Sequence, residues 1–118
     1  MAKKVSANRG KLLFLAMAVV IAAGPETASA QSATSVYTQQ CAECHGPKGK
    51  GDGPAGQVMA PPPGPFSNTL KGKSDGWIES VITQGGPAVG LSPGMPAHPN
   101  LSVSQVKDLT QSIKGLNS

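Results

Sequence analysis

The chain has 118 residues, 38% of them hydrophobic, and a formal net charge of +4. Most of this charge lies in residues 1–30, because residues 31–118 carry six lysines against five acidic residues and no arginine. This balance excludes a nucleic-acid partner, since phosphate recognition relies on an excess of basic residues and on arginine in particular.

Residues 1–30 have the three parts of a secretory signal peptide. A basic segment over residues 3–11 precedes an apolar run over residues 12–23, and Ala28-Ser29-Ala30 supplies the small residues of a cleavage site. The apolar run is shorter than the ~20 residues of a membrane-spanning helix, which disfavours an uncleaved anchor. We expect cleavage after Ala30, export to the periplasm and no stable membrane insertion. Residues 31–118 then form one small domain.

The first expected helix covers residues 33–42 and leads into Cys41-Ala42-Glu43-Cys44-His45. A Cys-x-x-Cys-His sequence in an exported protein predicts covalent attachment of a c-type haem. Two thiols at this spacing can each add to one vinyl group of the same haem, and the histidine that follows is held beneath the iron. Cys41 and Cys44 are therefore the predicted attachment residues, and His45 is a predicted axial ligand.

Two more helices are expected, each after a long loop. Residues 46–73 are rich in glycine and proline, with four prolines in residues 61–65, and predict extended backbone. The second helix begins near Ser74, carries an apolar stripe that includes Trp77, and ends at Gly85. A second loop over residues 85–100 precedes a third helix that starts at Ser102 with a capping-box pattern and ends near Gly115. We expect each loop to cover one side of the haem.

The second axial ligand has three candidates, because thioether and imidazole groups are the usual ligands of electron-transfer haems. Met95 lies in a Gly/Pro-rich loop fifty residues beyond His45, which is far enough to reach the opposite face. Met59 follows the haem motif by only fourteen residues and is expected near the haem edge. His98 would give a bis-histidine haem. We favour Met95, with the other two left open.

With these features the chain resembles the class I c-type cytochromes, small bacterial periplasmic monohaem proteins. The resemblance covers residues 33–116 and rests on the Cys-x-x-Cys-His helix, the glycine-rich and proline segments, the helix around Trp77, Gly94-Met95-Pro96 and the terminal helix. It implies an all-α fold of three to four helices and long loops around one haem c, with the first and last helices crossing. It also implies His45 and Met95 as axial ligands and a proline carbonyl from residues 61–63 as hydrogen-bond acceptor for His45.

The function expected from this resemblance is single-electron transfer between protein redox partners, without enzymatic activity. Two protein ligands would leave the iron no open position for a substrate. The chain is expected to be a monomer or a small subunit. Alternatives are a haem subunit of a larger dehydrogenase or oxidase, and a haem sensor or enzyme in which Met95 dissociates.

Weaker patterns have simpler interpretations. Gly51–Gly56 matches G-x-G-x-x-G, but no preceding strand is predicted, so nucleotide binding is disfavoured. Cys41, Cys44, His45 and His98 could supply zinc ligands, and the two cysteines could form a redox dithiol. Trp77 either reaches a haem propionate or packs in the core. Lys48, Lys50, Lys71 and Lys73 either steer an acidic partner or are simply solvated.

Overall fold

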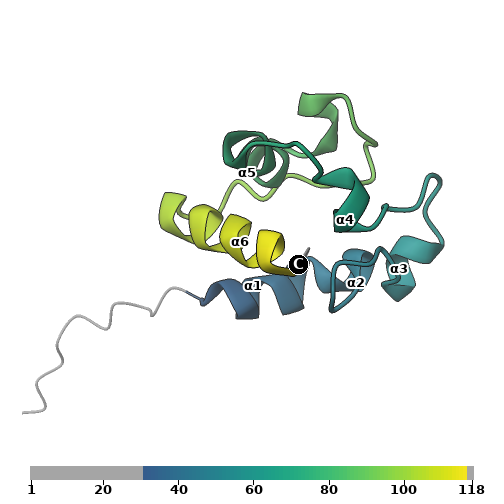
Figure 1. Ribbon diagram of the computed structural model, residues 1–118, viewed down its shortest axis with the longest axis horizontal. Coiled ribbons are helices and arrows are strands. Elements are labelled where there is room, and N and C mark those ends of the chain that lie inside the picture. Colours follow the sequence, from purple (N-terminus) through teal and green to yellow (C-terminus); the bar gives the residue numbers. More distant parts are fainter. Residues whose placement is uncertain (1–30, 117–118) are drawn as a thin grey trace, which may run out of the picture.

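The computed structural model describes residues 31–116, so the signal-peptide prediction for residues 1–30 lies outside the described part. The described residues form helices only, as the sequence predicts (Figure 1). In chain order these are α1 (Ala33–Gln40), α2 (Ala42–His45), α3 (Pro54–Gln57), α4 (Phe66–Thr69), α5 (Asp75–Gln84), the 3₁₀ helix η1 (Gly86–Val89) and α6 (Val103–Leu116). Within residues 31–116, none of these helices has the length and apolarity needed to cross a membrane.

The first predicted helix is divided in two at Cys41. Ser32 caps α1 by accepting a hydrogen bond from the Ser35 N–H. Cys41 has φ −119° and ψ −41°, outside ideal helical values, and α2 continues directly after it. The Cys41 N–H still bonds to the Tyr37 oxygen at 2.9 Å, and the His45 N–H bonds to the Cys41 oxygen at 2.9 Å. The haem motif therefore remains on a helical turn.

The helices α1 and α6 pack against each other, which confirms the expected crossing of the first and last helices (Figure 1). The aromatic side chain of Tyr37 has no aromatic partner on α6, where Leu109, Thr110 and Ile113 are buried. Its partner is Phe66 of α4, whose ring centroid lies 6.4 Å away in an edge-on arrangement. The eight buried hydrophobic residues of the core are Val36, Tyr37, Phe66, Ile78, Ile82, Val106, Leu109 and Ile113.

The two longer helices after the haem motif begin as the sequence predicts. Ser74 caps α5 by accepting a hydrogen bond from the Trp77 N–H at 3.1 Å. Ser102 and Gln105 form the reciprocal capping box at α6, with bonds of 3.1 and 2.9 Å. Gly85, with φ +85°, ends α5 in a backbone conformation that favours glycine. These caps fix where the flanking loops start.

The two expected loops are not wholly irregular, because they contain α3, α4 and η1, each four residues long. Gly53 and Gly56, part of the G-x-G-x-x-G pattern, lie against α2. A Cβ on Gly53 would overlap the main-chain oxygen of Glu43, and one on Gly56 would overlap that of Cys44. Both glycines are thus explained by close helix packing, and no strand precedes them within the described residues. A nucleotide site is not supported.

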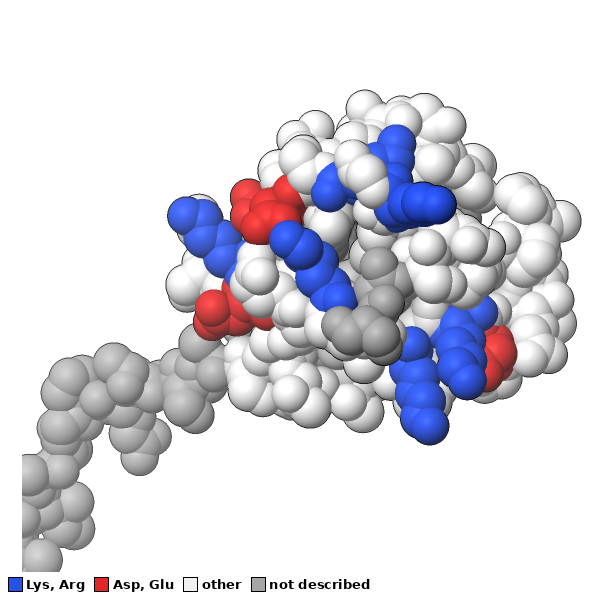
Figure 2. Space-filling view, in the orientation of Figure 1, with Lys and Arg blue, Asp and Glu red and all other residues white. Residues whose placement is uncertain are grey.

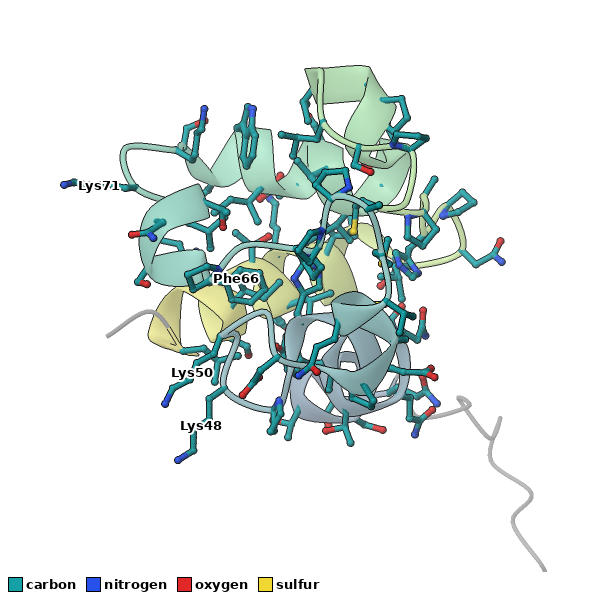
Figure 3. The ribbon with its side chains drawn as sticks, turned by 90° about the vertical axis from the view of Figure 1, so that its right-hand side faces the viewer. Lys48, Lys50, Phe66 and Lys71 are labelled. Atoms are coloured by element: carbon teal, nitrogen blue, oxygen red, sulfur yellow. The ribbon has the colours of Figure 1, made fainter. Side chains whose placement is uncertain are left out.

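Charged side chains are spread over the surface. On the face shown in Figure 2, lysines occur over several elements, with acidic side chains beside some of them. Lys48, Lys50 and Lys71 are exposed and project outward in Figure 3, on the side where Phe66 is labelled. Lys73 instead has its Nζ atom 4.6 Å from the centre of the Trp77 ring, a cation–π contact. The four lysines are therefore not equivalent.

Candidate functional site

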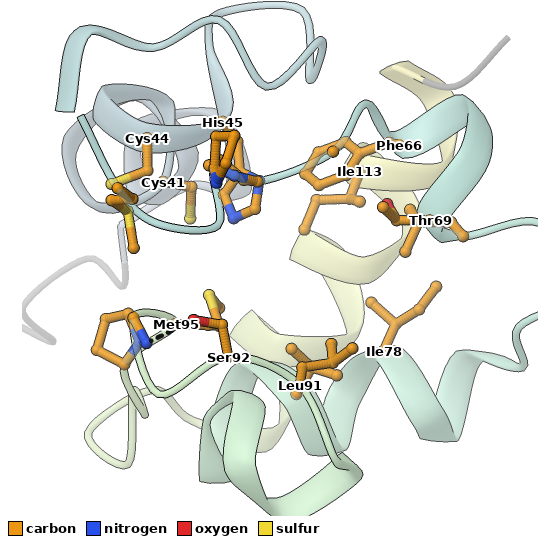
Figure 4. Close-up of a pocket in the computed structure, with 18 of the residues that line it drawn as sticks. Cys41, Cys44, His45, Phe66, Thr69, Ile78, Leu91, Ser92, Met95 and Ile113 are labelled. Carbon is orange, nitrogen blue, oxygen red and sulfur yellow. Dashed lines mark hydrogen bonds between the residues drawn. The ribbon is translucent and has the colours of Figure 1, made fainter. Parts of the chain in front are cut away.

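A cavity of about 290 Å³ lies between the haem-motif helix and the loop that carries Met95. Figure 4 shows Cys41, Cys44 and His45 on one side and Leu91, Ser92 and Met95 on the other. We call Cys41–His45 the helical wall and residues 91–98 the loop wall. Among residues 31–116, no Lys, Arg, Asp or Glu lines the cavity. Outside these two walls, the residues that line the cavity are Gln40, Met59, Pro61, Pro62, Pro63, Gly64, Phe66, Thr69, Leu70, Trp77, Ile78, Val81 and Ile113.

The helical wall presents two free thiols to this cavity. Cys41 and Cys44 both line it, are partly buried and form no disulfide. Burial, with the neighbouring Cys44, raises the pKa of Cys41 to about 11, so its side chain is a neutral thiol near pH 7. Both thiols are thus present in the same cavity as His45.

The His45 imidazole is held in its neutral form at the cavity. Burial lowers its pKa, because removal from water disfavours the charged imidazolium. The Phe66 ring lies against it, with centroids 4.9 Å apart. Neutral imidazole is the form that binds a metal. Phe66 was missed as a site residue in the sequence, although it is the one aromatic residue in the Gly/Pro-rich segment 46–73.

The second ring nitrogen of His45 has no hydrogen-bond partner. Among the described residues, Nδ1 of His45 is the one buried side-chain polar atom left unpaired. The expected bond to a carbonyl of residues 61–63 is not formed, although Pro61, Pro62 and Pro63 line the same cavity. The Pro63 oxygen lies instead against Gly51, where an added Cβ would overlap it. Metal-bound histidines normally donate their other ring N–H to an acceptor, so the unpaired Nδ1 differs from the arrangement expected for His45.

The loop wall is held to α5 and η1 by main-chain hydrogen bonds. The Gly86 N–H donates to the Met95 oxygen at 3.0 Å, and the Met95 N–H donates to the Ser92 oxygen at 3.2 Å. The His98 N–H donates to the Ile82 oxygen at 2.8 Å. These bonds fix the backbone of Met95, and Figure 4 shows its side chain directed into the cavity, opposite His45.

The other two ligand candidates also line the cavity, but each has a structural contact. The methyl group of Met59 lies against Gly94, where an added Cβ would overlap it. The His98 ring donates from Nδ1 to Oε1 of Gln40 at 3.0 Å. Trp77 is partly buried, packs against the core and lines the cavity, so its packing role is confirmed and its contact with a haem propionate stays a prediction. Gln40 was not singled out in the sequence.

A zinc site is not formed by these residues. Within residues 31–116, no three His, Cys, Asp or Glu side chains come close enough to hold a metal ion. The two cysteines also lie in an all-helical context, whereas a thioredoxin-like dithiol requires a βαβ unit. The cavity instead combines a thiol pair, an imidazole and thioethers with an uncharged lining, which suits a large apolar group with a metal at its centre.

The described domain is all-helical and is built around this cavity, with a Cys-x-x-Cys-His motif in one wall. These features together define a class of haem proteins. The family model for Cytochrome c matches residues 30–117, and the chain belongs to that family. Family membership supports haem binding and electron transfer with protein redox partners. A search of curated proteins found no match.

Proposed function

We propose that this protein is a periplasmic single-electron carrier with one haem c, bound covalently by Cys41 and Cys44 and axially by His45 and Met95. The observation that carries the proposal is the placement of His45 and Met95 on opposite walls of one apolar cavity that also contains both thiols. The bound group would supply a one-electron iron couple. The protein residues would supply its attachment, its two axial ligands and its exclusion from water.

The residues present are suited to this group in three respects. The neutral imidazole of His45 can bind iron without losing a proton. The Met95 backbone is fixed at both its N–H and its carbonyl, which favours a constant ligand position in both oxidation states. The uncharged lining and thioether ligation favour a higher reduction potential than bis-histidine ligation in a polar site.

A role as an electron carrier follows if protein side chains bind the haem iron on both of its faces. If His45 and Met95 both bind, the iron has no open position for a substrate, so electrons pass through partner contact alone. Contact areas of redox encounters are small and transient. The exposed Lys48, Lys50 and Lys71 can raise the association rate with an acidic partner. Dissociation of Met95 would instead favour the sensor or enzyme alternative.

The deciding experiment is a visible spectrum of the ferrous protein with and without carbon monoxide. The wild type should give a low-spin c-type spectrum that carbon monoxide leaves unchanged. Met95→Ala should bind carbon monoxide, whereas Met59→Ala should not. A Met95→Ala protein that stays low-spin and unreactive would overturn the ligand assignment, and failure to acquire haem in a haem-attaching host would overturn the proposal as a whole.

The location and the partners need separate measurements. Intact mass of the exported protein should correspond to residues 31–118 plus one haem; a retained Met1 would contradict cleavage after Ala30. Electron-transfer rates that fall as salt rises would support lysine steering. Copurification with a larger enzyme would favour the subunit alternative over a free carrier.

A further inference from the structure

One side-chain hydrogen bond joins the loop wall to the end of α1, directly before the helical wall. Nδ1 of His98 donates to Oε1 of Gln40 at 3.0 Å, across 58 residues of sequence. Gln40 is the last residue of α1 and directly precedes Cys41, and His98 follows Met95 by three residues. The bond therefore connects the chain at its attachment cysteine with the chain at its proposed sixth ligand.

The same two residues separate the main cavity from a second one. Gln40 and His98 line the cavity between the walls, and both also line a neighbouring polar cavity of about 330 Å³. The other described residues that line this second cavity are also uncharged, and they are Gln31, Ala97, Pro99, Asn100, Leu101 and Gln105. The pair thus forms a partition at one side of the proposed haem site.

Every other hydrogen bond of the loop wall in the described part of the chain stays on the α5 side or within the loop. The bonds of Met95 and of the His98 N–H reach Gly86, Ser92 and Ile82. The Gly94 N–H donates to Ser92 Oγ. Among residues 31–116, the His98–Gln40 bond alone joins residues 91–98 to α1 or α2 by hydrogen bonding.

We propose that Gln40 and His98 are a positioning pair that holds the Met95 loop against the haem-motif helix and so limits dissociation of the Met95 thioether from iron. This inference rests on the proposed function, because it assumes that Met95 is the sixth ligand. Neither residue ligates the metal. Loss of the tie lets the loop wall move away from the helical wall on its α5 anchor, and an external ligand then competes more easily with Met95.

The test measures binding of free imidazole to the ferric haem protein, which reports how readily the sixth ligand is displaced. Gln40→Ala and His98→Ala should each raise the imidazole association constant about twofold to threefold, the effect expected for loss of one solvent-exposed hydrogen bond. The double variant should show no further rise, since either single change already breaks the tie. Gln39→Ala is the matched control, because Gln39 lies on the same helix and bonds to Ser35 instead; its affinity should equal that of the wild type.

Three outcomes would overturn the inference. One is unchanged imidazole affinity in Gln40→Ala, and another is additive effects in the double variant. The third is a loss of the low-spin spectrum in His98→Ala without added imidazole, which would make His98 itself the ligand. These results differ from failure of the proposed function, in which the wild-type protein would already lack haem or bind carbon monoxide.

Discussion

The two walls of the cavity are built in different ways. In the helical wall, the haem motif lies on a helical turn, and α3 packs on it so closely that Gly53 and Gly56 leave no room for a Cβ. The loop wall has no helix at Met95, and it is held by hydrogen bonds to α5 and η1 and by the His98–Gln40 tie. It also makes close contacts, of Ser92 with Gly86 and of Gly94 with Met59. The position of His45 is thus set by packing between helices, and that of Met95 by the contacts and hydrogen bonds of a loop.

This difference predicts which of the two proposed axial ligands is displaced more easily. Displacing His45 requires disruption of packed helices, whereas moving Met95 requires the loss of loop contacts and of a few hydrogen bonds, each worth about 1 kcal/mol. Substitutions in the helical wall should therefore lower global stability. Substitutions in the loop wall should change ligand exchange at the iron with little loss of stability.

The largest expected effect is that of Gly56→Ala in the helical wall. The new methyl group would overlap the Cys44 main-chain oxygen and approach Cγ of Pro63 to 2.9 Å, so α2 and α3 must separate. We expect a loss of about 3 kcal/mol in the free energy of unfolding, measured by denaturant titration. Gly76→Ala is the control, because a Cβ there meets open space. Equal stability of the two variants would contradict the close packing of this wall.

A smaller effect is expected for Tyr37→Phe. The Tyr37 hydroxyl donates to the Gly46 oxygen at 2.6 Å in a buried setting, and burial raises its pKa to about 12. Removing the hydroxyl deletes one of the two hydrogen bonds that the Gly46 oxygen accepts, the other coming from the Gly49 N–H, and should cost about 1 kcal/mol of unfolding free energy. Thr38→Val also deletes a hydroxyl bonded to a main-chain oxygen, but an exposed one. An equal loss of unfolding free energy in the two variants would show that burial does not strengthen the Tyr37–Gly46 hydrogen bond.

A substitution in the loop wall should change ligand exchange at the iron more than it changes the free energy of unfolding. Ser92 Oγ accepts a hydrogen bond from the Gly94 N–H at 3.1 Å, next to Met95. Ser92→Ala should cost about 0.5 kcal/mol of stability and raise imidazole affinity about twofold. Ser80→Ala, which removes a hydroxyl bonded within α5, should leave imidazole affinity unchanged. A Ser92→Ala variant with lower stability and normal ligand exchange would break the comparison between the walls.

The smallest effect is expected away from both walls, at the ion pair between Lys114 and Asp75. The two groups are 2.6 Å apart and both are nearly half exposed, so solvent and salt screen them. Hydrogen bonds from Lys114 and Gln111 lower the Asp75 pKa. Since the folded pKa is depressed below its ordinary value, the stabilisation is present at neutral pH and is lost as the pH falls through the folded pKa.

Lys114→Met tests this pair by thermal unfolding across pH. Its melting temperature should lie slightly below that of the wild type at pH 7, and the difference should disappear in acid. Lys107→Met is the control, because Lys107 has no ion pair among the described residues. A difference that persists unchanged in acid would show that the Lys114 effect comes from packing rather than from the charge of Asp75.

Parts of the fold that depend on local sequence were predictable. The caps at Ser74 and Ser102 and the glycine at the end of α5 are short-range patterns, and the structure has each of them. The break at Cys41 and the four-residue helices α3 and α4 were not predicted, because such short segments depend on packing against α2 and α6. The contact of Tyr37 with Phe66 of α4 was not predicted either, because the two residues are far apart in the chain.

The sequence by itself determined the chemistry of this protein: the spacing of Cys41, Cys44 and His45 is local, so the haem motif could be recognised without the fold. Only the tertiary structure decided which distant groups meet that motif. Phe66 beside His45, the unpaired Nδ1 atom, Met59 against Gly94 and the His98–Gln40 tie all join segments far apart in the chain. The reason is physical, since these contacts depend on how the helices and loops pack around the cavity and leave no short-range pattern in the sequence.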